Sequence, residues 1–180
     1  LKEMGLELEV LSEKSEAGEL VSDIFIKYGE LKAIEINKEQ VPSLIDEIPL
    51  LAVIATQAIG KTKIRGAREL RVKESDRLAA MENFINELDG EITTFEDGFE
   101  INGKQNLQSG VVETLEDHRI AMTAVVANIC IDSQIKADNI ACISDSYPDF
   151  FFDLEKNSET LRFLRFSLLQ HTTVVLCDIH

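Results

Sequence analysis

Cysteine, proline, tryptophan and basic residues are all scarce in this sequence, and each shortage bears on the class of protein. The 180 residues include 3 cysteines, 3 prolines and no tryptophan, with 18 Lys and Arg against 33 Asp and Glu. Three cysteines without a C-x-x-C pair are too few for a disulfide framework and fit a reducing cytosol. The net charge of -15 repels phosphate backbones. We therefore predict a cytoplasmic protein with no nucleic-acid partner.

The sequence also lacks a run of apolar residues long enough to cross a membrane. Its most apolar stretch, Ile48 to Ile59, is interrupted by Thr56 and Gln57 and falls short of the ~20 residues that a membrane span requires. It predicts a buried helix and no membrane partner. The first five residues carry no secretory signal and resemble the last turn of a helix already under way, so we expect the natural protein to extend upstream.

What the sequence does contain is one order of elements that occurs twice. The stretch from Leu44 to Gly60 matches the stretch from Leu115 to Ile131 at an offset of 71 residues, and in each an aspartate, Asp46 or Asp117, opens an apolar helix. A helix that is apolar on nearly all sides must be surrounded by other elements. The repeat predicts an α/β (α+β) fold with buried helices inside, sheets outside and units of the order β-α-β-α-β-β.

The second helix of the first unit is marked by four apolar residues at helical spacing: Leu78, Met81, Ile85 and Leu88. We expect Ser75 to cap the start of this helix and Gly90 to close its end. A hairpin should follow, in which Asp97-Gly98 joins strands over 91–96 and 99–103 through a type I′ turn.

The N-terminal segment predicts two further strands. Alternating apolar residues mark a strand over 6–10, strand-like residues recur over 21–26, and a polar loop is expected between them from Ser12 to Gly18. Residues 1–156 form the predicted domain, with about two repeat units. Residues 157–180 fit neither unit and receive no functional role, although 172–176 are strand-like by composition.

Basic residues are concentrated in one short segment. Seven of the 18 fall within positions 61–77: Lys61, Lys63, Arg65, Arg68, Arg71, Lys73 and Arg77. Only three acidic residues oppose them there, so the segment carries a net charge of +4. An acidic protein that collects its cations in one place is suited to hold an anion. The alternative is a solvated strand face whose cations pair with neighbouring acids.

One group of polar residues lies at the start of the helix that contains Arg77. Unpaired N–H groups and the helix dipole attract phosphate or carboxylate at such a place. Arg77 can clamp an anion bidentately, and Lys73 can add a mobile point charge. Glu74 suits an ordinary salt bridge or, if partly desolvated, proton transfer.

The two apolar helices carry polar residues at their starts as well. Asp46 and Asp117 are most simply N-caps. His118 and Arg119 follow Asp117 at the mouth of a very apolar helix, so they must point toward solvent or a ligand. Because the repeat makes the two helix starts equivalent, we expect both to face one cleft together with the segment from Lys73 to Arg77.

Four motifs, in this order and spacing, resemble the C-terminal part of the 5-enolpyruvylshikimate-3-phosphate synthase family. They are Ile45-Asp46-Glu47-Ile48-Pro49, the string from Glu69 to Leu78, Asp117-His118-Arg119-Ile120-Ala121-Met122, and Ser146-Tyr147-Pro148-Asp149-Phe150-Phe151. The resemblance runs from Leu1 to about Glu155. It implies the inside-out α/β prism of the enolpyruvyl transferases and makes residues 1–156 an incomplete domain of that kind.

The resemblance also implies a reaction. Members of the family transfer the enolpyruvyl group of phosphoenolpyruvate to the 5-hydroxyl of shikimate 3-phosphate and release phosphate, a step of the shikimate pathway of aromatic amino-acid synthesis. The family uses no metal and no organic cofactor. Addition and elimination through a tetrahedral intermediate require a base, an acid and cations for the anionic groups.

Residue roles follow from the same resemblance. Asp46 matches the catalytic proton acceptor that contacts the shikimate hydroxyls, and Glu74 matches the catalytic glutamate of proton transfer at the enolpyruvyl methylene. Lys73 matches a lysine of the shikimate 3-phosphate site. The residues that match the phosphoenolpyruvate site are Arg77, His118 and Arg119.

The sequence departs from the family pattern in three respects. Asp145 stands where some members have a lysine that contacts phosphate. Residues 157–180 look foreign to the family. The family's N-terminal domain, which carries a Lys-Ser pair and further arginines for both substrates, is absent, so we expect this missing domain to be a required partner and the chain alone to be inactive.

Two alternative functions stay open. UDP-N-acetylglucosamine enolpyruvyl transferase shares the architecture and the donor, but it usually has a leucine where His118 stands and lacks the Lys-Glu-Ser-Asp-Arg string. The second alternative is a non-catalytic anion-binding half-domain retained for its fold.

Overall fold

The computed structural model describes residues 1–16, 18–27, 29–131, 133–156 and 174–176, and the chain divides into two compact units. One unit combines Leu1–Leu31 with the residues from Phe151 onward, and the other is Lys32–Phe150. All of the predicted site residues belong to the second unit.

The first unit contains a three-stranded sheet in the order β1-β2-β9. Strand β1 (Glu7–Glu16) pairs antiparallel with β2 (Glu19–Lys27), and β2 pairs antiparallel with β9 (Val174–Leu176). The predicted loop over Ser12–Gly18 is therefore wrong, since Ser12 to Glu16 continue the strand after an irregularity at Val10. Their polar side chains did not predict pairing because strand β1 lies at the edge of the sheet, where such side chains reach water. The apolar residues of 161–169 lie outside the described residues.

The second unit begins with a parallel strand pair crossed by a helix. Strand β3 (Glu35–Ile36) pairs with β4 (Gly60–Ile64), and α1 (Ile48–Gln57) connects them after the 3₁₀ turn η1 (Val41–Ser43). After a second 3₁₀ turn, η2 (Arg68–Val72), come α2 (Arg77–Glu87), β5 (Thr93–Phe95) and β6 (Gly98–Gly103). The strands form a sheet in the order β3-β4-β6-β5.

The same arrangement then recurs. Strand β7 (Gly110–Val112) pairs in parallel with β8 (Ile135–Ala137), and α3 (His118–Cys130) connects them. The short helix α4 (Ile143–Ser146) follows, and residues 150–156 are helical. The predicted recurrence of strand, apolar helix and strand is confirmed.

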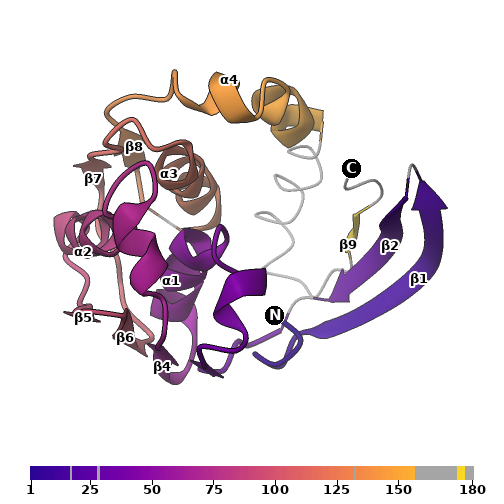
Figure 1. The fold of residues 1–180 in the computed structure, drawn as a ribbon, viewed down its shortest axis with the longest axis horizontal. Helices are drawn as coiled ribbons and strands as arrows, with labels where there is room; N and C mark the ends of the chain where they lie inside the picture. The colour runs from indigo at the N-terminus through magenta and orange to yellow at the C-terminus, as the bar shows by residue number, and fades with distance from the viewer. Residues whose placement is uncertain (17, 28, 132, 157–173, 177–180) are drawn as a thin grey trace. The chain divides into compact units, whose positions relative to one another are not determined.

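The two apolar helices form the centre of the second unit. Helices α1 and α3 pack against each other, with strands β4 to β6 along one side and β7 and β8 on another (Figure 1). Ile48 and Ala52 of α1 and Ile120 and Ala121 of α3 are fully buried. Small and branched side chains at these positions let the helices approach closely while sheets cover them. The mixed α/β fold with internal helices and external strands is as predicted.

The helix caps differ in detail from the predicted ones. Asp76, rather than Ser75, caps α2, and its carboxylate accepts a hydrogen bond from the N–H of Ala79. Asp46 does not cap α1, because the N–H of Ile48 already reaches the carbonyl of Leu44 in the preceding turn. Glu47 occupies the N-cap position without a side-chain bond. Both Ser75 and Asp46 are thereby free to make contacts away from their own helices.

Two glycines that were expected to serve turns serve close packing instead. Asp89, with φ 56°, takes the left-handed position after α2, while a Cβ on Gly90 would lie 2.6 Å from Cδ2 of Leu107. The predicted hairpin is present, but Phe95 pairs with Gly98, so its loop is Glu96-Asp97, one residue earlier than expected. A Cβ on Gly98 would lie 1.9 Å from the carbonyl oxygen of Ile64. The space between neighbouring elements, rather than the turn, requires glycine at both positions.

Candidate active site

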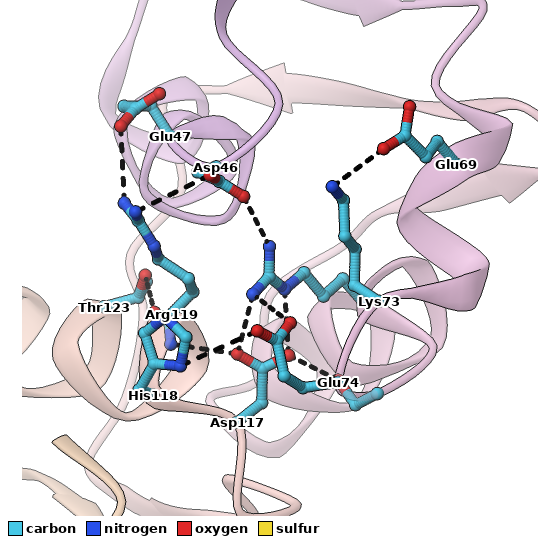
Figure 2. Close-up of polar contacts among 11 residues, drawn as sticks. Asp46, Glu47, Glu69, Lys73, Glu74, Asp117, His118, Arg119 and Thr123 are labelled. Atoms are coloured by element: carbon cyan, nitrogen blue, oxygen red, sulfur yellow. Dashed lines mark hydrogen bonds and ion pairs between the residues drawn. The ribbon is translucent and has the colours of Figure 1, made fainter. Parts of the chain in front are cut away.

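The starts of α1, α2 and α3 meet in one cluster of charged side chains (Figure 2). The guanidinium of Arg77, in the first turn of α2, reaches Asp46 beside α1 and Asp117 at the start of α3. Residues 46, 77 and 117 are far apart in sequence, so only the packing of the three helices brings them together. The predicted convergence of the two equivalent helix starts with the segment from Lys73 to Arg77 is confirmed.

Arg77 lies at the centre of this cluster and is bound by three carboxylates. Its side chain is only 1% exposed. Nε donates to Asp117 at 2.8 Å and Nη2 donates to the other oxygen of Asp117 at 3.2 Å. Nη2 also donates to Glu74 at 2.7 Å, and Nη1 donates to Asp46 at 3.0 Å. An arginine in this position organises acidic groups from all three helices, and four of its hydrogen bonds go to the chain's own acids.

Asp117 combines two roles in the cluster. Its side chain is fully buried; it caps α3 by accepting from the N–H of Arg119 at 2.9 Å, and it also accepts from the hydroxyl of Ser75 at 2.9 Å. Burial alone would raise the pKa of Asp117, but the hydrogen bonds from Arg77 and Ser75 outweigh it and hold the pKa below its usual range. These contacts favour the ionised form of the buried Asp117, and the N-cap expected from the sequence is confirmed.

Asp46 and Glu74 differ from Asp117 because they are half-exposed, at 42% and 49%. Each accepts a hydrogen bond from Arg77 through one oxygen, and its other oxygen faces a different basic side chain. For Asp46 this side chain is Arg119, at 3.7 Å, and for Glu74 it is the imidazole of His118, at 4.0 Å. These two carboxylates can move away from Arg77 into solvent without leaving a charge buried.

Arg119 is held more loosely than Arg77. Its closest charged contacts are Glu47 at 3.3 Å and Asp46 at 3.7 Å, and its side chain is 31% exposed. Within the described part of the chain its Nε is buried without a hydrogen-bond partner. Arg119 thus retains a hydrogen-bond donor that its contacts with Glu47 and Asp46 do not use.

Lys73 lies on the approach to α2, partly exposed, and pairs with Glu69 four positions earlier at 2.8 Å. The hydrogen bond from Lys73 to Glu69 raises the pKa of the lysine, and the charge of Asp46 contributes in the same direction. Lys73 is therefore cationic beside the carboxylates of the cluster.

The remaining cations of the basic segment do not form a free anion-binding surface. Each is paired with an acid: Lys61 and Arg65 with Glu100, Lys63 with Glu35, Arg68 with Glu96, and Arg71 with Asp76. For these five positions the structure therefore favours the second interpretation of the sequence, a surface on which each cation pairs with a neighbouring acid. Lys73 and Arg77, at the end of the segment, are also paired with acids, but they lie in the cluster at the helix starts, where the Arg77 partners Asp46 and Glu74 are half-exposed.

Sequence reasoning missed three members of the cluster. Glu69 and Glu47 neutralise Lys73 and Arg119, and Ser75 bonds Asp117 instead of capping its own helix. Glu69 was detectable as the acidic residue four positions before a lysine. Glu47 and Ser75 gave no such signal, because their contacts cross between helices. In the part of the chain that the structure describes, no group of three or more acidic, histidine or cysteine side chains is placed to hold a metal ion.

Among the described residues, no helix is both long enough and apolar enough to cross a membrane. Cys130 and Cys142 are free thiols, and burial raises the pKa of both.

Several bacterial proteins with similar sequences are named 3-phosphoshikimate 1-carboxyvinyltransferases. A 3-phosphoshikimate 1-carboxyvinyltransferase of Sulfurihydrogenibium sp. (strain YO3AOP1) is 49% identical over 159 residues, which are 88% of this chain and 37% of the relative. This chain therefore spans just over a third of the length of that relative.

Solved structures agree with the sequence comparison. An EPSP synthase of Acinetobacter baumannii is 34% identical with a TM-score of 0.80, over 98% of this chain and 39% of the other. The enolpyruvyl transferase NikO of Streptomyces tendae, at 18% identity and a TM-score of 0.59 over 86% of this chain and 33% of its own, shares the fold. A model of the family described as EPSP synthase (3-phosphoshikimate 1-carboxyvinyltransferase) matches residues 1–154, and the chain belongs to this family.

Proposed function

We propose that this chain supplies part of the active site of a 3-phosphoshikimate 1-carboxyvinyltransferase. The complete enzyme transfers the enolpyruvyl group of phosphoenolpyruvate to the 5-hydroxyl of shikimate 3-phosphate and releases inorganic phosphate. The free thiols are compatible with a cytoplasmic location, where the shikimate pathway would use this product for aromatic amino acids.

The proposal depends most on one observation, the sharing of Asp46 between two arginines. Arg77 lies 3.0 Å and Arg119 lies 3.7 Å from the two oxygens of this half-exposed carboxylate. Two guanidinium groups that meet at one exposed carboxylate form a site whose charge and geometry also suit the carboxylate or phosphate of phosphoenolpyruvate. In the resting arrangement the side chain of Asp46 occupies part of this site.

Asp46 and Glu74 are suited to the two proton transfers of the reaction. In the addition step Asp46 takes the proton of the 5-hydroxyl of shikimate 3-phosphate, and the oxygen of that hydroxyl bonds to C2 of phosphoenolpyruvate. Glu74 supplies a proton to the methylene carbon. In the elimination step Glu74 takes back a proton from the resulting methyl group, the carbon–carbon double bond re-forms, and the bond from C2 to the phosphate oxygen breaks. Phosphate departs with the proton that Asp46 holds. Positioned carboxylates accelerate such transfers when they lie within hydrogen-bond reach.

Binding of the donor at Arg77 requires one exposed carboxylate to move. Asp117 is fully buried and keeps its two bonds to Arg77, whereas Asp46 and Glu74 can turn into solvent. An incoming anion would take the Nη1 or Nη2 hydrogen bonds that they vacate. The same displacement frees Asp46 and Glu74 for the acceptor hydroxyl and the methylene, so donor binding and activation of the two carboxylates are linked.

Turnover is expected only when the rest of the enzyme is present. The chain spans 37% of the length of the Sulfurihydrogenibium relative, and the cluster described above contains few cations that are not already paired. A test joins this chain to the remaining segment of that relative, to give a protein that we call the joined protein. Phosphate release is then measured with phosphoenolpyruvate and shikimate 3-phosphate.

We expect the joined protein to release phosphate with shikimate 3-phosphate and not with UDP-N-acetylglucosamine as acceptor. The chain alone should release none with either acceptor. The intact relative, assayed in parallel, shows that the conditions support turnover. A joined protein that folds but remains inactive with shikimate 3-phosphate would refute the proposal, and activity with UDP-N-acetylglucosamine would assign the chain to the other transferase.

A further inference from the structure

The turn directly before α3 has an unusual backbone. Leu115 and Glu116 have φ values of 54° and 57°, and they are the only adjacent left-handed residues other than glycine in the described part of the chain. This conformation is unfavourable for side chains that have a Cβ, and most of all for a bulky one such as leucine. Two such residues in succession persist only where surrounding contacts hold them.

Asp138 provides the main side-chain contact that holds this turn. Its Oδ1 accepts a hydrogen bond from the N–H of Thr114 at 2.9 Å and another from the hydroxyl of Thr114 at 2.8 Å. Thr114 is fully buried, so both of its donors depend on a partner within the protein. Asp138 follows strand β8, and its own N–H extends the parallel pairing by donating to Val112 at 3.0 Å. The carboxylate thereby ties the turn to the end of the strand pair.

The turn leads straight into the active-site cluster. The N–H of Asp117 donates to the carbonyl of Thr114 at 3.0 Å and closes the turn. Asp117 then binds Arg77 through both carboxylate oxygens, and Arg119 follows two residues later. The backbone position of Thr114 therefore sets where Asp117 meets Arg77 and where the arginine of the neighbouring turn points.

From these contacts we propose that Asp138 is a positioning residue of the enzyme: by holding Thr114 and the left-handed turn at Leu115-Glu116, it places Asp117 and Arg119 against Arg77 and Asp46. Asp138 itself touches none of the reacting groups. Its effect on the rate rests on the proposed function, whereas its effect on the position of the helix start does not. The two effects are measured separately.

Four variants separate positioning from a general loss of stability. Asp138→Ala removes the acceptor, and Asp138→Asn keeps an oxygen that can accept both bonds from Thr114. Thr114→Val removes only the hydroxyl donor at nearly constant shape. Ile135→Val is the matched control, because it shortens a buried side chain of the same strand, β8, without touching the turn.

The first measurement uses the 180-residue chain and records backbone amide resonances by NMR. We expect Asp138→Ala and Thr114→Val to displace the resonances of residues 114–119 and of Arg77, and Ile135→Val to leave them in place. Asp138→Asn should retain the wild-type positions. Unchanged resonances of Asp117 and Arg119 in the first two variants would overturn the proposal, whatever the activity.

The second measurement uses the joined protein and separates kcat from KM for phosphoenolpyruvate. A misplacement of about 1 Å can cost roughly a hundredfold in rate, so we expect kcat to fall ten- to a hundredfold in Asp138→Ala and to return to within about threefold in Asp138→Asn. Ile135→Val should stay within twofold of wild type. If kcat fell equally in Asp138→Ala and Ile135→Val, Asp138 would only stabilise the fold and would not position the start of α3.

Two outcomes remain to be distinguished. If Asp138→Ala fails to fold, Thr114→Val decides the question, because it deletes one of the two bonds and leaves the backbone bond intact. If the wild-type joined protein is inactive, the proposed function fails, while the resonances of the chain still test whether Asp138 positions the start of α3.

Discussion

Replacement of Arg77 by methionine should lower the free energy of unfolding by more than the loss of a surface ion pair would. Methionine replaces the aliphatic part of the side chain and its packing but has no charge and no N–H donor. Asp117, fully buried, would keep only the hydrogen bonds from Ser75 and from the N–H of Arg119. Removal of one partner from a buried ion pair leaves an uncompensated charge and costs about 3–5 kcal/mol. The half-exposed partners Asp46 and Glu74 add little, since exposed pairs contribute about 0–1 kcal/mol each.

The pH dependence identifies the cause of this loss. In the wild type the pKa of Asp117 lies below its unfolded value, so its contribution to stability is present above the unfolded pKa and is lost as the pH falls through the folded pKa. In Arg77→Met, burial without the guanidinium should raise the folded pKa above the unfolded one. The variant is then least stable above its folded pKa and recovers as acid neutralises the carboxyl. The difference in free energy of unfolding between the two proteins should therefore shrink from pH 7 toward pH 4.

Urea unfolding followed by far-ultraviolet circular dichroism measures these differences. Arg68→Met is the matched control, since Arg68 pairs with Glu96 on the surface with both side chains over 70% exposed; its loss should stay below about 1 kcal/mol. The double variant Arg77→Met/Asp117→Asn should recover part of the stability, because an amide can still cap α3. Equal losses in Arg77→Met and Arg68→Met, or a loss that does not change with pH, would refute the account of Arg77 as the partner of a buried anion.

Three further predictions concern the exposed side of the cluster in the joined protein. Glu74→Gln should tighten phosphoenolpyruvate binding roughly threefold in calorimetry, because a neutral amide competes less than a carboxylate for Arg77, and it should lower kcat. Weaker binding would contradict the displacement of Glu74 by the donor. Arg119→Ala should weaken donor binding roughly tenfold or more with a thermal stability near that of wild type, and normal binding would remove Arg119 from the donor site. Asp46→Asn should lower kcat without unfolding α1, whose N-cap is Glu47; normal turnover in steady-state assays would exclude Asp46 as the base.

Periodicity and repetition were sufficient to predict the interior of the second unit. Apolar runs after Asp46 and Asp117 could belong only to buried helices, and the recurrence of the same order at a fixed offset placed both helix starts in equivalent positions. Equivalent positions in adjacent repeats meet when the helices pack together, which is why the convergence of the charged residues was predictable from spacing alone.

The contacts within the cluster were not predictable in the same way. Whether Arg77 is free or paired depends on which acids the folded chain brings to it, and its partners Asp46 and Asp117 lie 31 and 40 positions away. The predicted cap at Ser75 failed for a related reason, since the Ser75 hydroxyl donates to the buried carboxylate of Asp117, and Asp76 accepts the hydrogen bond from the helix N–H instead. The strand predicted over residues 6–10 is the first part of β1, but its continuation from Ser12 to Glu16 was missed because the polar residues there give no alternation to detect.

The tie between Arg77 and Asp117 also limits how this unit can be rearranged. Arg77 belongs to the first copy of the repeated motif and Asp117 to the second, and each is buried only because the other compensates its charge. A polypeptide cut between β6 and β7 would leave Asp117 in the second half without the guanidinium that compensates its charge, while Arg77 in the first half would keep only the half-exposed Asp46 and Glu74. The second half is therefore poorly suited to an independent existence. If one copy were exchanged for that of a distant homologue, the new copy would have to carry an arginine at the position of Arg77 or an aspartate at the position of Asp117 to pair with the copy that stays.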